Sequence, residues 1–275
     1  EKMYKRMNEQ LQKEGAMALV TGASSGIGLA YARELARRGY DLLLVSNEQE
    51  RIGTVAEELA AAFGVKTIPL CMDLARSEAA RELYDYCERE KLQIGILVNN
   101  AGIFFFDDLT EVAPERIETM LLLHIRTVTL LCRYFGAAMK RRRAGYILNM
   151  SSLSAWTPAP GISVYAASKS YIRKFSQMLR YELHQYGVGV TTVCPGAIAT
   201  GLYNLSDYYQ RLALRLGVMM KPERLARKGL RAMFARRDYI LPGAVNRFFV
   251  LALYLLPVQL IYYIKEHTKL YRYGR

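Results

Sequence analysis

The sequence is poor in the side chains that build metal and disulfide sites. Its 275 residues include only four cysteines and three histidines. The cysteines have neither the spacing of metal ligands nor that of a redox pair, and each lies in an apolar segment. We therefore expect no metal site, and we expect reduced thiols in the core at Cys71, Cys87, Cys132 and Cys194.

Several other signals are also missing. The chain has no internal repeat, no low-complexity tract and no motif typical of nucleic-acid binding. No secretory signal precedes the first predicted strand. These absences predict a cytoplasmic protein without a nucleic-acid partner.

Acidic side chains are scarce relative to basic ones, with 25 Asp and Glu against 38 Lys and Arg and a net charge of +13. Residues 221–275 hold 12 of the basic residues and only 3 of the acidic ones. The basicity is therefore expected to be a C-terminal feature and not a property of the main fold.

What the sequence does contain is an apolar run, over residues 17–30, that breaks into glycines and restarts with helical spacing. This pattern predicts a strand, a tight turn and a helix start. Gly22, Gly26 and Gly28 let the backbone turn sharply and approach a ligand without an intervening Cβ. The N–H groups and dipole of the new helix favour an anion such as pyrophosphate. Alone, three glycines also fit an ordinary glycine-rich connection.

Helical and strand patterns alternate along the rest of the chain. Continuous apolar strands, such as 42–45 and 94–98, are typical of a parallel sheet covered on both faces. The sequence therefore predicts an α/β fold with a doubly wound parallel sheet in one domain over 16–245. An amphipathic helix over 1–15 precedes it, and an apolar and basic helical extension over 246–275 follows. Further helices are expected at 29–38, 50–62, 76–90, 114–142 and 163–186, and strands at 41–46, 65–71, 94–99, 145–150, 188–194 and 239–241.

Unusual residues follow the strands at the carboxyl edge of the predicted sheet, where such folds bind ligands. They are Asn-Asn-Ala-Gly at 99–102, Asn-Met-Ser-Ser at 149–152 and Cys-Pro-Gly at 194–196. Tyr165 and Lys169 are four residues apart and share one helical face. A free phenol has a pKa of about 10, and a nearby cation lowers it, so the pair can act as an acid or base. Without further context, such a pair is more often a surface contact.

Together these motifs resemble the short-chain dehydrogenase/reductase family over about residues 16–200, in the family's order and spacing. The resemblance implies a Rossmann-type sheet and a nicotinamide cofactor, NADP or NAD. It also implies hydride transfer between that cofactor and a carbonyl or secondary alcohol. The motifs are the glycine turn, Asp73, Asn99 to Gly102, Ser152, Tyr165 with Lys169, and Pro195-Gly196 followed by Thr200.

The resemblance also implies roles for individual residues. Tyr165 gives or takes the proton at the substrate oxygen, and Ser152 hydrogen-bonds the same oxygen. Lys169 lowers the pKa of the phenol and holds the nicotinamide ribose. Ser152 is chosen over Ser151 because it lies thirteen residues before Tyr165, as the family serine does. Cofactor contacts are expected from Gly22, Ser24, Ser25, Gly26, Ile27, Gly28, Ser46, Asn47, Asp73, Leu74, Asn99, Ala101, Gly102, Tyr165, Lys169, Pro195, Gly196, Ile198 and Thr200.

Two positions depart from the family pattern. His124 stands where the family has the helix asparagine of its proton relay, and it is either a further catalytic residue or a packed core side chain. Ser46-Asn47-Glu48 offers neither the aspartate typical of NAD binding nor a nearby basic residue for NADP. The small neutral groups favour NADP, although Glu48 would repel its 2′-phosphate if it turned inward.

Residues 197–225 are expected to form a substrate lid. Their apolar side chains, with those of the loop after Ser152, favour a lipophilic ketone or alcohol, such as a steroid or 3-oxo lipid, over a small polar substrate. The same side chains also fit lid packing alone. A non-catalytic nucleotide sensor is the alternative from another class. The lid and loop residues are Leu153, Trp156, Pro158, Leu202, Tyr203, Leu205, Tyr208 and Tyr209.

Residues 248–264 form a run of seventeen residues without a charge, interrupted by Pro257 and flanked by basic side chains. A transmembrane helix needs about 20 apolar residues, so the run is a poor span. It fits either a segment on an anionic membrane surface or two short helices packed on the fold. By the resemblance, the helices at 114–142 and 163–186 form a homodimer or tetramer.

Overall fold

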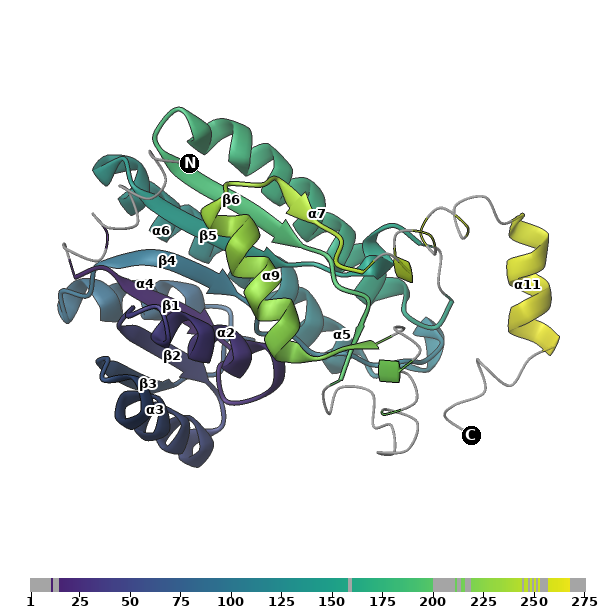
Figure 1. The fold of residues 1–275 in the computed structure, drawn as a ribbon. Coiled ribbons are helices and arrows are strands. Elements are labelled where there is room, and N and C mark those ends of the chain that lie inside the picture. The colour runs from purple at the N-terminus through teal and green to yellow at the C-terminus, as the bar shows by residue number, and fades with distance from the viewer. Residues whose placement is uncertain are drawn as a thin grey trace.

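A parallel sheet forms the centre of the computed structural model (Figure 1). The structure describes residues 15–157, 160–199, 219–243 and 257–267, together with the single residues 11, 211, 214, 215, 245, 246, 248, 250 and 252. The strands of this sheet are β1 (Met17–Thr21), β2 (Leu42–Ser46), β3 (Thr67–Cys71), β4 (Ile94–Asn99), β5 (Gly145–Met150), β6 (Val188–Val193) and β9 (Tyr239–Ile240). Their order in space is β3-β2-β1-β4-β5-β6-β9, and all are parallel. The predicted doubly wound sheet is confirmed.

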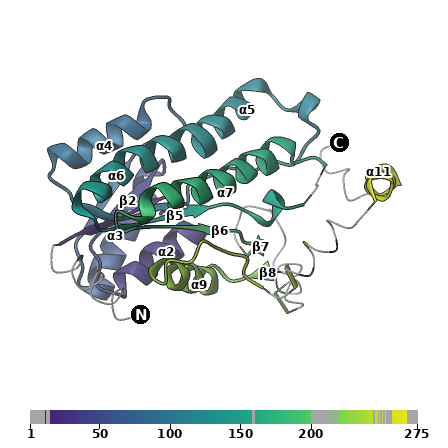
Figure 2. The same ribbon diagram turned by 90° about the horizontal axis from the view of Figure 1, so that it is seen from above.

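Helices cover both faces of this sheet (Figure 2). They are α2 (Gly26–Ala36), α3 (Gln49–Phe63), α4 (Ala79–Arg89), α5 (Pro114–Leu121), α6 (Val128–Arg142), α7 (Ser163–His184), α9 (Pro222–Phe234) and α11 (Val258–His267). Shorter elements are the 3₁₀ turns η1 (Leu109–Glu111) and η3 (Leu153–Ala155), the π-helical turn η2 (Leu122–Thr127), and the strands β7 (Ala197–Ile198) and β8 (Met219–Met220). The helices α2, α3 and α9 pack on one face, and α4, α6 and α7 on the other.

The core follows from the alternation of side chains along fully buried strands. In β1, Ala18 and Val20 pack toward α2, α3 and α9, whereas Met17 and Leu19 pack toward α4 and α6. The edge strand β3 is only partly buried and carries Pro69, a residue that edge strands tolerate. Cys71 at its end is exposed, so the expectation that all four thiols lie in the core is wrong for this one.

The strand order of the sheet changes direction at the boundary between the neighbouring strands β1 and β4. From β1 the chain adds β2 and then β3 on one side, and it returns to the other side of β1 with β4, β5 and β6. The loops that leave β1 and β4 therefore diverge to opposite faces, which opens a crevice at their carboxyl ends. This crevice holds the candidate site.

The helix predicted over 114–142 is interrupted. The α-helix α5 ends at Leu121, the π-helical turn follows over Leu122–Thr127, and α6 continues to Arg142. Thr127 Oγ1 donates to the Leu74 carbonyl at 2.8 Å, which ties the π-turn to the loop after β3. Such single π-turns are frequent at functional sites, and this one carries His124.

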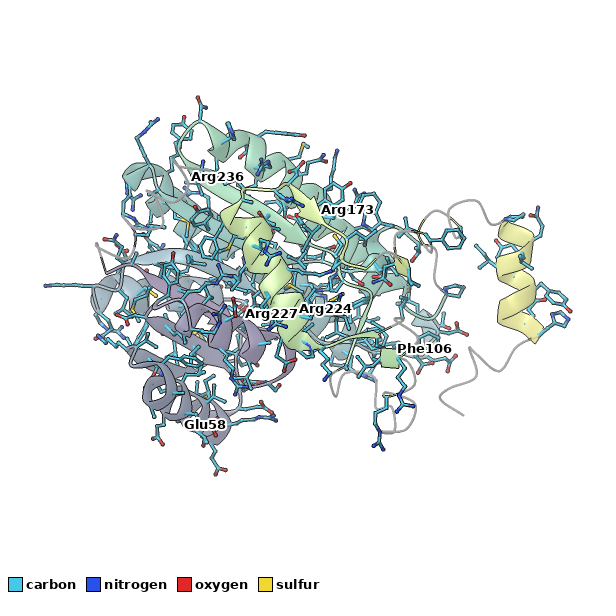
Figure 3. All side chains as sticks on the ribbon, viewed as in Figure 1. Glu58, Phe106, Arg173, Arg224, Arg227 and Arg236 are labelled. Carbon is cyan, nitrogen blue, oxygen red and sulfur yellow. The ribbon has the colours of Figure 1, made fainter. Side chains whose placement is uncertain are left out.

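Part of the C-terminal basic surplus belongs to the main fold, which corrects the expectation that it does not. The helix α9 packs on α2 and on the sheet through Leu225, Leu230 and Met233. Its opposite face exposes Arg224 and Arg227 (Figure 3). Because helical spacing separates the two faces, a segment that covers the core also presents cations to solvent.

Several predicted segments lie outside the described residues. In the amphipathic helix expected over 1–15, only Leu11, which is helical and buried, and Gly15 are described. In the expected lid, β7 pairs with β8, and residues from Pro222 onward belong to α9 and not to a lid. Within the described ranges no helix is long and apolar enough to cross a bilayer.

Candidate active site

Two adjoining cavities occupy the crevice at the carboxyl ends of the strands. The larger has a volume of about 720 Å³ and lies over the glycine turn and the ends of β2 and β3. The smaller, of about 80 Å³, lies between η2, the end of β5 and the start of α7. Both are lined by Ile27, Asn100, Gly102 and Ile103, so the cavities form one continuous site.

The glycine turn shapes the floor of the larger cavity. Gly22 and Gly26 adopt positive φ angles of 65° and 54°, which side chains with a Cβ rarely tolerate. A Cβ on Gly28 would overlap the carbonyl oxygen of Gly22, so α2 begins closely packed against the turn. The start of α2 lines the cavity at Gly26 and Ile27, where its first N–H groups are available to an anion. These residues fit the pyrophosphate of a dinucleotide.

The end of β2 forms one wall of the larger cavity. The buried Ser46 hydroxyl donates to Ser24 Oγ at 2.9 Å, and Asn47 and Glu48 also line this wall. Arg51 joins them from the first turn of α3, which begins at Gln49. The expectation that no basic residue lies near this strand end is therefore wrong, because the helix starts early enough to turn Arg51 toward the cavity.

Most of the other predicted cofactor residues also line the site. Asp73, Leu74 and Ala101 line the larger cavity, and Pro195, Gly196 and Ile198 line the smaller one. Asn99 lines neither cavity. Its amide lies beneath the floor and donates to Asn149 Oδ1 at 2.8 Å, which joins β4 to β5. Thr200 lies outside the described residues.

Ser152, Tyr165 and Lys169 meet at the smaller cavity. Ser152 caps the start of η3, and its Oγ accepts a hydrogen bond from the Ser154 N–H at 3.1 Å, so its own proton is not used in this contact. The neighbouring Ser151 hydroxyl is buried and donates to the Lys169 carbonyl at 2.7 Å. Both serines line the smaller cavity, but among the described residues only Ser151 has an acceptor for its hydroxyl proton.

Lys169 is a buried cation beside the phenol of Tyr165. Its Nζ donates to the Met150 carbonyl at 3.1 Å and lies 5.6 Å from the centre of the Tyr165 ring. Burial lowers the pKa of Lys169 to about 8, and the nearby Cys194 thiol opposes this shift. Lys169 is therefore charged at neutral pH but loses that charge more readily than an exposed lysine.

Sequence reasoning missed the aromatic run at 104–106, which follows the Asn-Asn-Ala-Gly motif. The ring of Phe104 meets Tyr165 edge-on, with centroids 5.0 Å apart and an interplanar angle of 89°. Phe106 fills the space at Gly161, where a Cβ would lie 3.0 Å from the ring. The signal was present, because three consecutive phenylalanines two positions after a ligand-binding motif are unusual in an exposed loop.

His124 reaches the smaller cavity from the π-turn. Its side chain is fully buried, and its pKa lies well below the ordinary value, mainly because of burial and also because of the charge on Lys169. Within the described part of the chain, no group of His, Cys, Asp and Glu side chains could hold a metal ion.

Comparison with known proteins gives a consistent result. The family model described as short chain dehydrogenase matches residues 16–207. A very-long-chain 3-oxoacyl-CoA reductase from Anas platyrhynchos is 37% identical, over 70% of this chain and 62% of its own length. An inactive hydroxysteroid dehydrogenase-like protein 1 from Homo sapiens is 32% identical, over 73% of this chain and 61% of its own length. The chain thus matches a little over three fifths of these relatives.

A solved structure that is similar to this chain also comes from a short-chain dehydrogenase. The short-chain dehydrogenase from Sphingobium yanoikuyae in complex with NADPH is 30% identical and superposes with a TM-score of 0.75, over 86% of this chain and 92% of its own. The family model covers well over half of the sequence, and the sheet order and the glycine turn agree with it. The chain belongs to the short-chain dehydrogenase family.

Proposed function

We propose that the protein is an NADP-dependent carbonyl reductase or alcohol dehydrogenase that acts on a lipophilic substrate. The observation that carries this proposal is the meeting of Ser152, Tyr165 and Lys169 in the smaller cavity, which adjoins the larger cavity over the glycine turn. When bound, the nicotinamide supplies or accepts the hydride. The chain itself supplies position, hydrogen bonds and a proton.

Two side chains act at the substrate oxygen, and a third acts through one of them. Ser152 donates its free proton to that oxygen and so holds the carbonyl in a fixed orientation. Tyr165 delivers a proton to the same oxygen during reduction and removes one during oxidation. The Lys169 ammonium stabilises negative charge on the phenol electrostatically and donates to the cofactor ribose.

The preference for NADP rests on Arg51. A 2′-phosphate at the wall formed by Ser46 and Asn47 would lie on the side of the cavity that Arg51 also lines. Guanidinium groups bind phosphate through paired hydrogen bonds. Glu48 lines the same wall and opposes the preference, so the two side chains compete.

A lipophilic substrate is supported by the aromatic surroundings of Tyr165. The Phe104 ring packs directly on the phenol, so a substrate that places its oxygen there has an apolar wall beside it. Relatives named as a very-long-chain 3-oxoacyl-CoA reductase and a 17-beta-hydroxysteroid dehydrogenase type 3 point in the same direction. The apolar side chains expected in the lid, at Leu202, Tyr203, Leu205, Tyr208 and Tyr209, lie outside the described residues. Trp156 of the loop after Ser152 is described and lines neither of the two cavities.

A screen of ketones and secondary alcohols with each cofactor, followed at the nicotinamide absorbance, tests the proposal. Long-chain 3-oxoacyl thioesters and steroid ketones should be turned over with NADPH, and sugars and small acids should not. Turnover of only small polar compounds would contradict the substrate class. Tight NADPH binding without turnover of any compound would favour a nucleotide sensor.

That sensor is the second candidate, because one relative is named as inactive. The residues of this chain disfavour it, since Ser152, Tyr165 and Lys169 are all present and all line the smaller cavity. A protein that only senses a nucleotide has no need of a proton donor at the substrate oxygen.

We also propose that the C-terminal segment binds an anionic membrane surface. Phe248, Tyr262 and Tyr263 expose 72%, 61% and 58% of their area, which is unusual for aromatic side chains in water. Basic residues flank this segment in the sequence. The full chain should float with anionic liposomes at low salt and less so at high salt, whereas a chain truncated after Val245 should not float.

Self-association through α7 is a further proposal. Tyr171, Met178 and Tyr181 are large side chains of α7 that are exposed. They would be covered if two copies packed this helix together, as the family resemblance implies. Light scattering should give twice or four times the mass of one chain, and Tyr181→Lys should lower that mass.

A further inference from the structure

His124 lies within a chain of hydrogen bonds that joins three parts of the candidate site. The Ile103 N–H donates to His124 Nε2 at 3.1 Å. On the other side of the ring, Nδ1 lies 2.9 Å from Ser168 Oγ, and the Ser168 hydroxyl donates to the Tyr165 carbonyl at 2.8 Å. The imidazole therefore connects the loop after β4, through the π-turn, to the first turns of α7.

The partners of His124 determine where its proton lies. A backbone N–H can only donate, so Nε2 must carry a lone pair toward Ile103. The proton of Ser168 is committed to the Tyr165 carbonyl, so Ser168 Oγ accepts, and Nδ1 carries the hydrogen. Both ring nitrogens of a neutral imidazole are then in use. Neither is left to receive a proton from the site.

The ring of Tyr165 touches groups whose positions depend on this connection. His124 meets it at 5.8 Å with an interplanar angle of 70°, and Phe104, which follows Ile103 in the loop, meets it at 5.0 Å. Lys169 lies over the same ring. A shift of the imidazole would move the loop that carries Phe104 relative to the helix that carries Tyr165.

We propose that His124 is a positioning residue, a neutral strut between the 103–106 loop and α7 that aims the Tyr165 hydroxyl and moves no proton itself. This inference rests on the proposed function, because it assigns the part that His124 plays at the same site. The space at Gly102 is consistent with it. A Cβ there would lie 2.9 Å from His124 Nε2, so the strut requires a glycine at its contact with the loop.

Amide side chains can test the two halves of the strut separately. Glutamine reaches about as far as Nε2 and can accept from the Ile103 N–H, whereas asparagine reaches only about as far as Nδ1. His124→Leu should lower kcat about tenfold through misplacement of the phenol, with NADPH affinity little changed. His124→Gln should recover most of that loss, and the deficit of every variant should be the same at each pH from about 6 to 9.

Two controls keep the test decisive. His184→Gln removes an exposed histidine from α7 and should leave kcat unchanged. If His124→Leu does not fold, Ser168→Ala breaks the same connection while the imidazole stays in place, and kcat should fall severalfold. A deficit that changes with pH, or recovery on adding free imidazole, would show that His124 relays protons. Unchanged kcat in both His124→Leu and Ser168→Ala would show that it only packs.

A measurement without turnover separates this inference from the proposed function. The chain has only three histidines, so a protein with ¹⁵N-labelled histidine gives few ring signals in NMR, and the exposed His184 and His267 serve as references. His124 should show the Nδ1–H tautomer and constant shifts from about pH 6 to 8. Titration of its signals in that range, or the Nε2–H tautomer, would overturn the strut even if no substrate were found.

Discussion

The two cavities of the site are built in different ways. The larger one depends on backbone packed so closely that only glycine fits, since a Cβ on Gly22 or Gly28 would collide with neighbouring atoms. The smaller one is built from side chains, and contacts with named partners hold Ser152, Lys169 and His124 in place. The larger cavity should therefore be sensitive to atoms that are added, and the smaller one to atoms that are removed.

The strongest test of this contrast removes a single oxygen from the smaller cavity. Tyr165→Phe deletes the proposed proton donor without changing the shape of the ring, so kcat should fall roughly 1,000-fold. NADPH affinity, measured by nicotinamide fluorescence, should change little. Tyr171→Phe is the matched control, because Tyr171 also lies on α7 but its exposed hydroxyl contacts Thr129 of α6. Substantial turnover by Tyr165→Phe would remove Tyr165 from the mechanism.

Adding one carbon to the glycine turn beneath the larger cavity should have the next largest effect. Gly28→Ala forces a Cβ against the Gly22 carbonyl and should weaken NADPH binding about 100-fold, because overpacking of this kind costs a few kcal/mol. Gly53→Ala is the control, since its Cβ meets open space on α3. That variant should bind normally and gain up to about 1 kcal/mol in free energy of unfolding. Equal effects at the two glycines would contradict the contrast.

A smaller effect is expected where the larger cavity does use a side chain. Arg51→Ala should shift the preference from NADP toward NAD about tenfold, or 1.4 kcal/mol, in the ratio of dissociation constants. Glu48→Arg should shift it in the opposite direction. Arg33→Ala, on α2 and outside the cavity lining, is the control. If the unmodified protein binds NAD tenfold better, the assignment of this wall to a 2′-phosphate is wrong.

The smallest effect concerns the pH dependence of stability. His124 is buried in its neutral form, so its pKa is lower in the folded than in the unfolded chain. The unfolded chain then binds the extra proton below about pH 6.5, and the free energy of unfolding should fall there by at most about 1.4 kcal/mol per pH unit. In urea titrations at several pH values, the free energy of unfolding of His124→Gln should fall less steeply below about pH 6.5 than that of the unmodified protein. If the free energy of unfolding of the variant falls just as steeply, groups other than His124 cause the loss of stability at low pH.

Local patterns were enough to predict much of the fold. The bounds expected for two central strands, 94–99 and 145–150, agree with β4 and β5. A continuous apolar run between polar loops leaves little choice of where a strand begins and ends. The same patterns failed where several elements meet. The exposure of Cys71 depends on β3 lying at the sheet edge, and the π-turn interrupts a helix whose sequence continues without a break.

The candidate site shows the same division. Tyr165 and Lys169 were found because four residues of helix place them on one face, and the glycines because their turn has a local signature. Arg51 was missed because its approach to the cavity depends on where α3 begins, and Phe104 because it joins the site only through contact with the distant Tyr165. The roles given to all these residues remain predictions that the variants above can test.

The sequence by itself determined the class of sheet, the position of the glycine turn and the set of reactive side chains, since periodicity and spacing act over a few residues. Only the tertiary structure decided how His124 is used. Its partners Ile103 and Ser168 lie 21 and 44 residues away in the chain. Because the sheet brings these segments together, the three-dimensional arrangement fixes the tautomer and the charge of that imidazole.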